Sequence, residues 1–224
     1  MLAQRPGRHA RVRSSFGRIA PVATLAAAVV GFAAAAQAVP PPGTQSVTVG
    51  CATAVYGQMG PHWRSPANGT LIAGPIAWPV LRLLATDSGG PPAASYAPYH
   101  GLATSVKALV AVNAGTVVRV QIPASERTRL SLDYTYIQTG RSTNRGTYFR
   151  IADGASQVTF KACSLAQSPT GQPSQFAGAF VVAGAQCARI DIYASASNRT
   201  LVRQIPFGVP ARSCPAAGRE TATH

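Results

Sequence analysis

The segment from Val158 to Cys187 constrains the fold more than any other stretch of the chain. It begins V-T-F-K-A-C, in which apolar and polar residues alternate. This two-residue period predicts a β-strand with one buried face. A second β-branched and aromatic run begins at Phe180, and each run ends at or near a cysteine, Cys163 or Cys187. We therefore expect strands and disulfide bonds at the centre of the domain.

Short runs of the same kind recur along the chain. Alternating apolar residues mark residues 47–51, 106–112, 118–122, 130–136 and 190–192, and we expect two further strands at 147–151 and 201–207. The 21 Gly and 18 Pro suit many turns, and no helical periodicity of about ten residues occurs after residue 40. The pattern predicts an all-β fold: an antiparallel β-sandwich, immunoglobulin-like or jelly-roll-like, with long loops and two disulfides.

One hairpin is predicted from its turn. Asn113-Ala114-Gly115 separates the alternating runs at residues 106–112 and 118–122. A three-residue connection that ends in Gly suits a type I turn with a bulge, because Gly tolerates the left-handed conformation.

The N-terminal segment predicts export. Residues 1–38 combine an arginine-rich start, an apolar run from Ala20 to Ala36 and the small residues of Ala36-Gln37-Ala38, as in a signal peptide cleaved before Val39. An uncleaved transmembrane anchor is the alternative. We expect a proline-rich leader at 39–46, the sandwich domain at 47–214 and a flexible tail at 215–224. The localisation expected is secreted or extracytoplasmic, at the cell envelope.

The four cysteines indicate two disulfides in an exported chain, and three connectivities are possible. We favour Cys163–Cys187, which closes a local loop, and Cys51–Cys214, which ties the first strand to the last. The spacing from Cys51 to Cys163 is too long for the immunoglobulin framework.

The charge suggests an anionic partner. The chain carries a net charge of +14, and removal of the five arginines before residue 20 leaves 15 basic against 6 acidic residues, or +9. A loop with Arg141, Arg145, Tyr148 and Arg150 interleaves arginines with aromatic residues, as in sites that hold phosphates or stack on rings. An anionic envelope polymer or a membrane surface would fit, and we do not expect nucleic acid to be the partner. The alternative is a solvated hairpin tip in a generally basic protein.

The sequence offers little for catalysis or cofactors. It has no G-x-S-x-G, C-x-x-C or H-x-x-x-H motif and no acidic calcium loop, so we expect neither a metal nor a cofactor. A secreted hydrolase of unrecognised type would need folding to bring together His100, Ser105 and Asp133.

Four short segments resemble uncharacterised secreted β-rich proteins of GC-rich bacteria. They are A-G-P-I at Ala73–Ile76, the V-T-F-K-A-C run, G-A-F-V-V-A-G-A-Q-C before residue 188, and I-P-F-G before Cys214. The resemblance implies export and a β-fold, and that family has no assigned activity.

These observations together predict an exported, non-enzymatic envelope or extracellular protein, either a binding or a structural module. A binder of anionic polymer or lipid headgroups through the arginine loop is one alternative, and a hydrolase is another. The ligand, the biological process and the oligomeric state do not follow from the sequence.

Overall fold

The computed structural model describes residues 45–55, 59, 63–135, 141–143, 146–168, 172–195, 197 and 199–216, with only the backbone at 141–143 and 146. These residues belong to one compact unit, Val39–His224. The predicted signal peptide or anchor, and most of the predicted leader and tail, lie outside the described residues.

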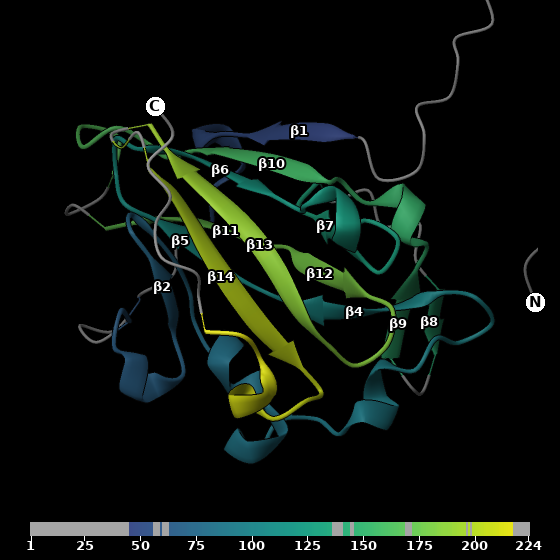
Figure 1. The fold of residues 1–224 in the computed structure, drawn as a ribbon. Coiled ribbons are helices and arrows are strands. Elements are labelled where there is room, and N and C mark those ends of the chain that lie inside the picture. The colour runs from purple at the N-terminus through teal and green to yellow at the C-terminus, as the bar shows by residue number, and fades with distance from the viewer. Residues whose placement is uncertain are drawn as a thin grey trace, which may run out of the picture. The chain divides into compact units, whose positions relative to one another are not determined.

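The described chain is all-β, as predicted, and forms three sheets (Figure 1). The first sheet has the order β1 (Ser46–Val49), β10 (Gln157–Lys161), β6 (Val117–Gln121), β13 (Gln186–Ala194) and β14 (Thr200–Phe207). The second has the order β11 (Ser174–Phe176), β5 (Val110–Val112), β3 (Ile76–Trp78) and β2 (Leu71–Ala73). The third has the order β7 (Leu130–Asp133), β12 (Ala179–Val182), β4 (Ala103–Lys107), β9 (Gly146–Phe149) and β8 (Arg141–Thr143).

The helical elements of the described residues are 3₁₀ turns of three or four residues. They are η1 (Cys51–Thr53), η2 (Pro66–Asn68), η3 (Leu81–Leu84), η4 (Thr86–Ser88), η5 (Ala93–Tyr96), η6 (Ala124–Glu126), η7 (Ile151–Asp153) and η9 (Ala211–Ser213). Within the described residues, no helix is long and apolar enough to cross a membrane.

The three sheets share one core, because strand alternation turns one face of each sheet inward. Two groups of aromatic rings join the layers. Phe180 of the third sheet lies 6.4 Å from Trp78 of the second and 5.7 Å from Phe207 of the first, between ring centroids. The second group joins Phe160 and Phe176 to Tyr134, which follows β7: the Phe160 ring lies 5.0 Å from Tyr134 and 5.4 Å from Phe176.

The predicted hairpin around Asn113-Ala114-Gly115 is wrong. The turn forms, with Gly115 at φ 73° and the Thr116 amide donating to the Asn113 carbonyl. However, β5 pairs with β3 and β11, whereas β6 pairs with β10 and β13. The turn therefore carries the chain from the second sheet to the first. Alternation alone does not distinguish such a crossing from a hairpin.

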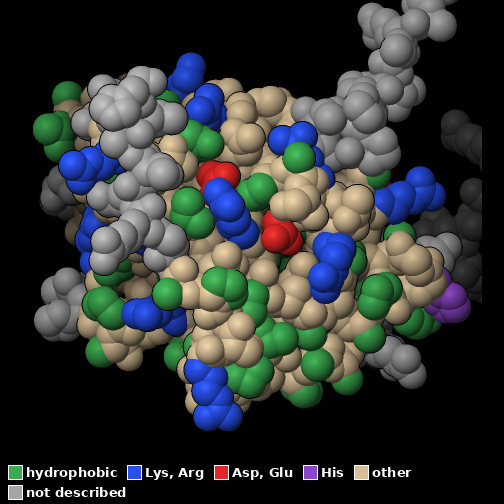
Figure 2. Space-filling model, viewed as in Figure 1, with side chains coloured by type: hydrophobic (Ala, Val, Ile, Leu, Met, Phe, Trp, Pro, Cys, Tyr) green, Lys and Arg blue, Asp and Glu red, His purple; other side chains and the backbone are tan. Residues whose placement is uncertain are grey.

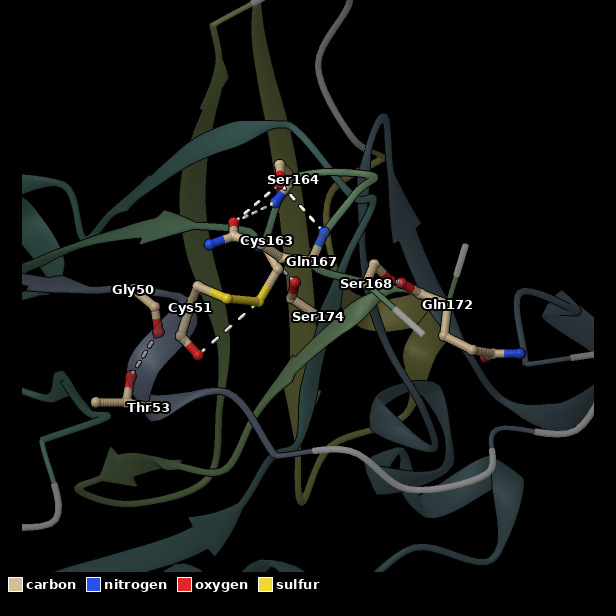
Figure 3. The surroundings of a disulfide bond; sticks show 9 residues. All are labelled: Gly50, Cys51, Thr53, Cys163, Ser164, Gln167, Ser168, Gln172 and Ser174. Atoms are coloured by element: carbon tan, nitrogen blue, oxygen red, sulfur yellow. Dashed lines mark hydrogen bonds between the residues drawn. A yellow bond between two sulfur atoms is a disulfide. The ribbon is translucent and has the colours of Figure 1, made fainter. Parts of the chain in front are cut away.

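The favoured disulfide pairing is also wrong, although the prediction of two disulfides is confirmed. The bridges are Cys51–Cys163 and Cys187–Cys214 (Figure 3 shows the first). β1 and β10 pair in parallel, with Val49 opposite Phe160. The chains leaving both strands therefore meet at the same end of the sheet, which places the Cα atoms of Cys51 and Cys163 at 4.7 Å.

The same sheet order separates the cysteines of the predicted bridge between Cys163 and Cys187. β10 and β13 each pair antiparallel with β6 and so run in the same direction. Cys163 follows the end of β10, whereas Cys187 lies near the start of β13, so the two occupy opposite ends of the first sheet. Cys187 is instead bridged to Cys214, which follows η9, with their Cα atoms 5.3 Å apart. The two disulfides indicate an oxidising, extracytoplasmic environment.

Candidate functional site

The third sheet carries a hollow on the face that is turned away from the core. Register places Lys107 of β4, Ala179 of β12 and Asp133 of β7 in one row across this face. The hollow, which we call the outer hollow, has a volume of about 460 Å³. It is lined by Ser105, Lys107, Leu109, Asp133, Thr147, Phe149, Ala177, Gly178 and Ala179.

Small residues form the floor of the outer hollow. Ala177, Gly178 and Ala179 lead into and begin β12, so the middle of the row lacks long side chains. Gly178 is needed here, because a Cβ at this position would overlap the Tyr134 ring beneath it. The Tyr134 ring thus requires a residue without a side chain at position 178, and the longer side chains of β4, β7 and β9 surround this floor.

Opposite charges lie on the two sides of the floor. Lys107 and Asp133 flank Ala179 on neighbouring strands, which corresponds to a Cα separation of about 10 Å. They do not pair with each other, and the ion pair within the described part of the chain is Arg189–Asp191 at 3.0 Å. The hollow therefore offers a cation and an anion with space between them.

Burial raises the pKa of Asp133. Loss of solvent is the main cause, and hydrogen bonds from the backbone and hydroxyl of Thr135 to the carboxylate partly oppose it. Burial without a nearby cation disfavours the charged carboxylate. A positively charged group entering the hollow would compensate that penalty and lower the pKa of Asp133.

The structure brings together part of the predicted catalytic group. Ser105 and Asp133 both line the outer hollow, but His100 is not among its lining residues. His100 is exposed, with φ 50°, and its ring lies 4.3 Å from that of Tyr99 in an edge-on arrangement. The described lining thus supplies a hydroxyl and a carboxylate without the imidazole that a triad would use.

The predicted arginine loop adjoins the same sheet. Arg141 begins β8, whereas its side chain and the whole of Arg145 lie outside the described residues. Arg150 is exposed at the start of η7. Tyr148 is only 5% exposed, and its ring lies 5.2 Å from that of Tyr99. Its ring is therefore packed and does not offer an open stacking surface.

The charge of the described surface is strongly basic. The described side chains include 12 Lys or Arg against 5 Asp or Glu. Figure 2 shows Lys and Arg spread over the face that carries β13 and β14, with few acidic side chains. Arg119 of β6 and Tyr193 of β13 are paired in the first sheet, and the guanidinium carbon of Arg119 lies 4.2 Å from the centroid of the Tyr193 ring. Within the described residues, no group of three or more His, Cys, Asp or Glu could hold a metal.

Sequence reasoning did not identify Lys107, Phe149 or the small floor residues as site residues. Lys107 and Asp133 each occupy an outward position of an alternating run, which is a signal that the sequence contains. Their proximity depends on β12, which lies between them in the sheet but follows both in the chain.

Comparison with known proteins finds no match: no family model matches the chain, and neither a curated protein nor a solved structure does.

Proposed function

We propose that this protein is an extracytoplasmic, non-enzymatic binding module that holds a small ligand in the outer hollow. One observation carries the proposal: Lys107 and Asp133 flank a floor of small residues without pairing with each other. Concave sites that place a few polar groups beside apolar surface are typical of small-ligand sites. The hollow's volume of about 460 Å³ falls within the usual range for such sites.

The charges favour a ligand that carries both signs. An anionic group would interact with the Lys107 ammonium, and a cationic group would relieve the cost of ionising the partly buried Asp133. Phe149 and Leu109 also line the hollow and supply apolar contacts. A free amino acid with an apolar side chain has this combination of groups.

The test measures binding of leucine by isothermal titration calorimetry, with N-acetyl-leucine and leucine amide as ligands that each lack one charge. We expect leucine to bind more tightly than either derivative. Lys107→Met and Asp133→Asn should each weaken binding by about tenfold, the usual effect of losing a hydrogen-bonded charge.

Matched controls are available in the same chain. Lys161→Met and Asp153→Asn make the same charge changes at exposed positions that do not line the hollow, and they should leave binding unchanged. Equal binding of the three leucine ligands, or equal losses in the control variants, would contradict the proposal.

A second candidate function is binding to an anionic envelope polymer. The excess of basic side chains in the described chain, with a single ion pair among them, favours it. Here the contact would include Arg150, together with Arg141 and Arg145, which precede it closely in the sequence. Affinity for a polyanion such as polyglutamate should then fall steeply with salt, and replacing these three arginines by glutamate should abolish it. Salt-independent binding would rule this function out.

A further inference from the structure

An arginine on the last strand points into the sandwich instead of toward solvent. Arg203 of β14 pairs with Ile190, whose side chain is fully buried in the core. Since paired residues share a face, Arg203 is directed inward, and it is partly buried. Its Nε donates to the Ile72 carbonyl at 3.1 Å, and its Nη1 donates to the Val202 carbonyl at 2.8 Å.

This guanidinium has no carboxylate at ion-pair distance within the described part of the chain. Withdrawing a charge from water is costly unless an opposite charge or several hydrogen bonds replace the water. The two carbonyls fix the orientation of the planar group but leave its charge without a counter-ion. A guanidinium held in this way is suited to an incoming carboxylate or phosphate, which it can bind with two parallel hydrogen bonds.

Arg203 lies at a groove between the edges of two sheets. β14 ends the first sheet and β2 ends the second, and the Arg203–Ile72 hydrogen bond crosses the gap between these strands. The groove has a volume of about 720 Å³ and is larger than the outer hollow. Its walls include Leu71, Leu81, Leu83 and Ile205, together with a second cation, Arg82.

The groove thus combines an apolar wall with two arginines, and no acidic residue is among its described lining. Leu83 is 43% exposed, so part of this apolar surface is open to solvent. We propose that the groove binds a single-chain amphiphile with an anionic head group. The head group contacts Arg203 and Arg82, and the hydrocarbon chain lies along the exposed Leu83 and the partly buried Leu71. This site is separate from the outer hollow and does not depend on its function.

The alternative role of Arg203 is protection of a strand edge. Charged residues that point inward on edge strands prevent those edges from pairing with other chains. The two roles make different predictions, because edge protection requires no ligand and predicts self-association once the charge is lost.

The experiment is calorimetric titration with decanoate below its micelle concentration. Octanoate tests the effect of hydrocarbon chain length, and decyltrimethylammonium tests the effect of the charge of the head group. We expect decanoate to bind about tenfold more tightly than octanoate, from two additional buried methylenes. The cationic amphiphile should not bind. Arg203→Met and Arg82→Met should each reduce decanoate affinity, the former by at least about tenfold. Arg119→Met, which makes the same charge change at an exposed position outside the groove, should have no effect.

Size-exclusion chromatography and thermal melting accompany each variant. Should Arg203→Met not fold, Arg203→Lys, which keeps the charge but loses the planar fork, and Arg82→Met still test the site. The proposal is overturned if the wild type does not bind decanoate, if it binds the cationic amphiphile equally, or if Arg119→Met causes the same loss. Self-association of Arg203→Met without any decanoate binding by the wild type would assign Arg203 to edge protection instead.

Discussion

The two disulfides should differ in their contribution to stability, in an order fixed by the structure. Cys51–Cys163 joins residues 112 apart, whereas Cys187–Cys214 joins residues 27 apart. In the chain-entropy model, the bridges restrict the unfolded chain by about 4.8 and about 3.6 kcal/mol, respectively. Removal of Cys51–Cys163 should therefore cost about 1 kcal/mol more than removal of Cys187–Cys214.

The assay compares Cys51→Ala/Cys163→Ala with Cys187→Ala/Cys214→Ala in urea unfolding, followed by circular dichroism. Both variants lose two cysteines and the one bridge between them, so they are matched in chemistry and differ mainly in loop length. Proteolytic mapping without reduction should first recover a peptide that joins residue 51 to residue 163. A peptide that joins Cys163 to Cys187 would refute the reasoning from the parallel pairing of β1 and β10. A greater loss of stability on removing the bridge with the shorter loop would refute the reasoning from loop length.

Three further predictions concern single side chains. Asp133→Asn should stabilise the protein near neutral pH. Burial raises the folded-state pKa of Asp133, so ionisation of the carboxyl costs stability as the pH rises above the ordinary carboxyl pKa. Thermal melting at several pH values should therefore show a gain in stability that vanishes in acid. Tyr134→Phe should lower the free energy of unfolding in urea by about 1–3 kcal/mol. The reason is that the Tyr134 hydroxyl donates to the Ala108 carbonyl at 2.8 Å and accepts from the Trp78 indole at 3.3 Å. A change below about 0.5 kcal/mol would contradict this prediction. Phe180→Ala should cost about 3–5 kcal/mol, since Phe180 is fully buried where the three sheets meet, and a loss typical of a surface residue would place it outside the core.

The local signals in the sequence were sufficient for the strands themselves. Alternation predicted the buried faces of β6, β10 and β13, because the two-residue period of a strand is a property of the backbone. The turn at Asn113-Ala114-Gly115 was also predicted, since it depends on a few adjacent residues. The sheet to which each strand belongs was not predicted, because alternation states that a face is buried and does not identify its partner.

The candidate sites illustrate the same division. Ser105 and Asp133 were considered from the sequence, and the fold does place both at the outer hollow. Lys107 joins them only because β12 inserts between β4 and β7. Arg203 has no distinguishing signal in the sequence, because its inward direction follows from its register with β13.

The sequence by itself determined the all-β class, the presence of two disulfides and the turn at Asn113-Ala114-Gly115, because these depend on composition, cysteine number and the conformational preferences of short segments. The tertiary structure alone decided which cysteines pair, which strands share a sheet and which charges meet. Those outcomes depend on contacts between distant segments, such as the pairing of β1 with β10, and on the burial of aromatic rings from all three sheets in one core. Many pairings satisfy the local patterns, and the shared core selects one of them.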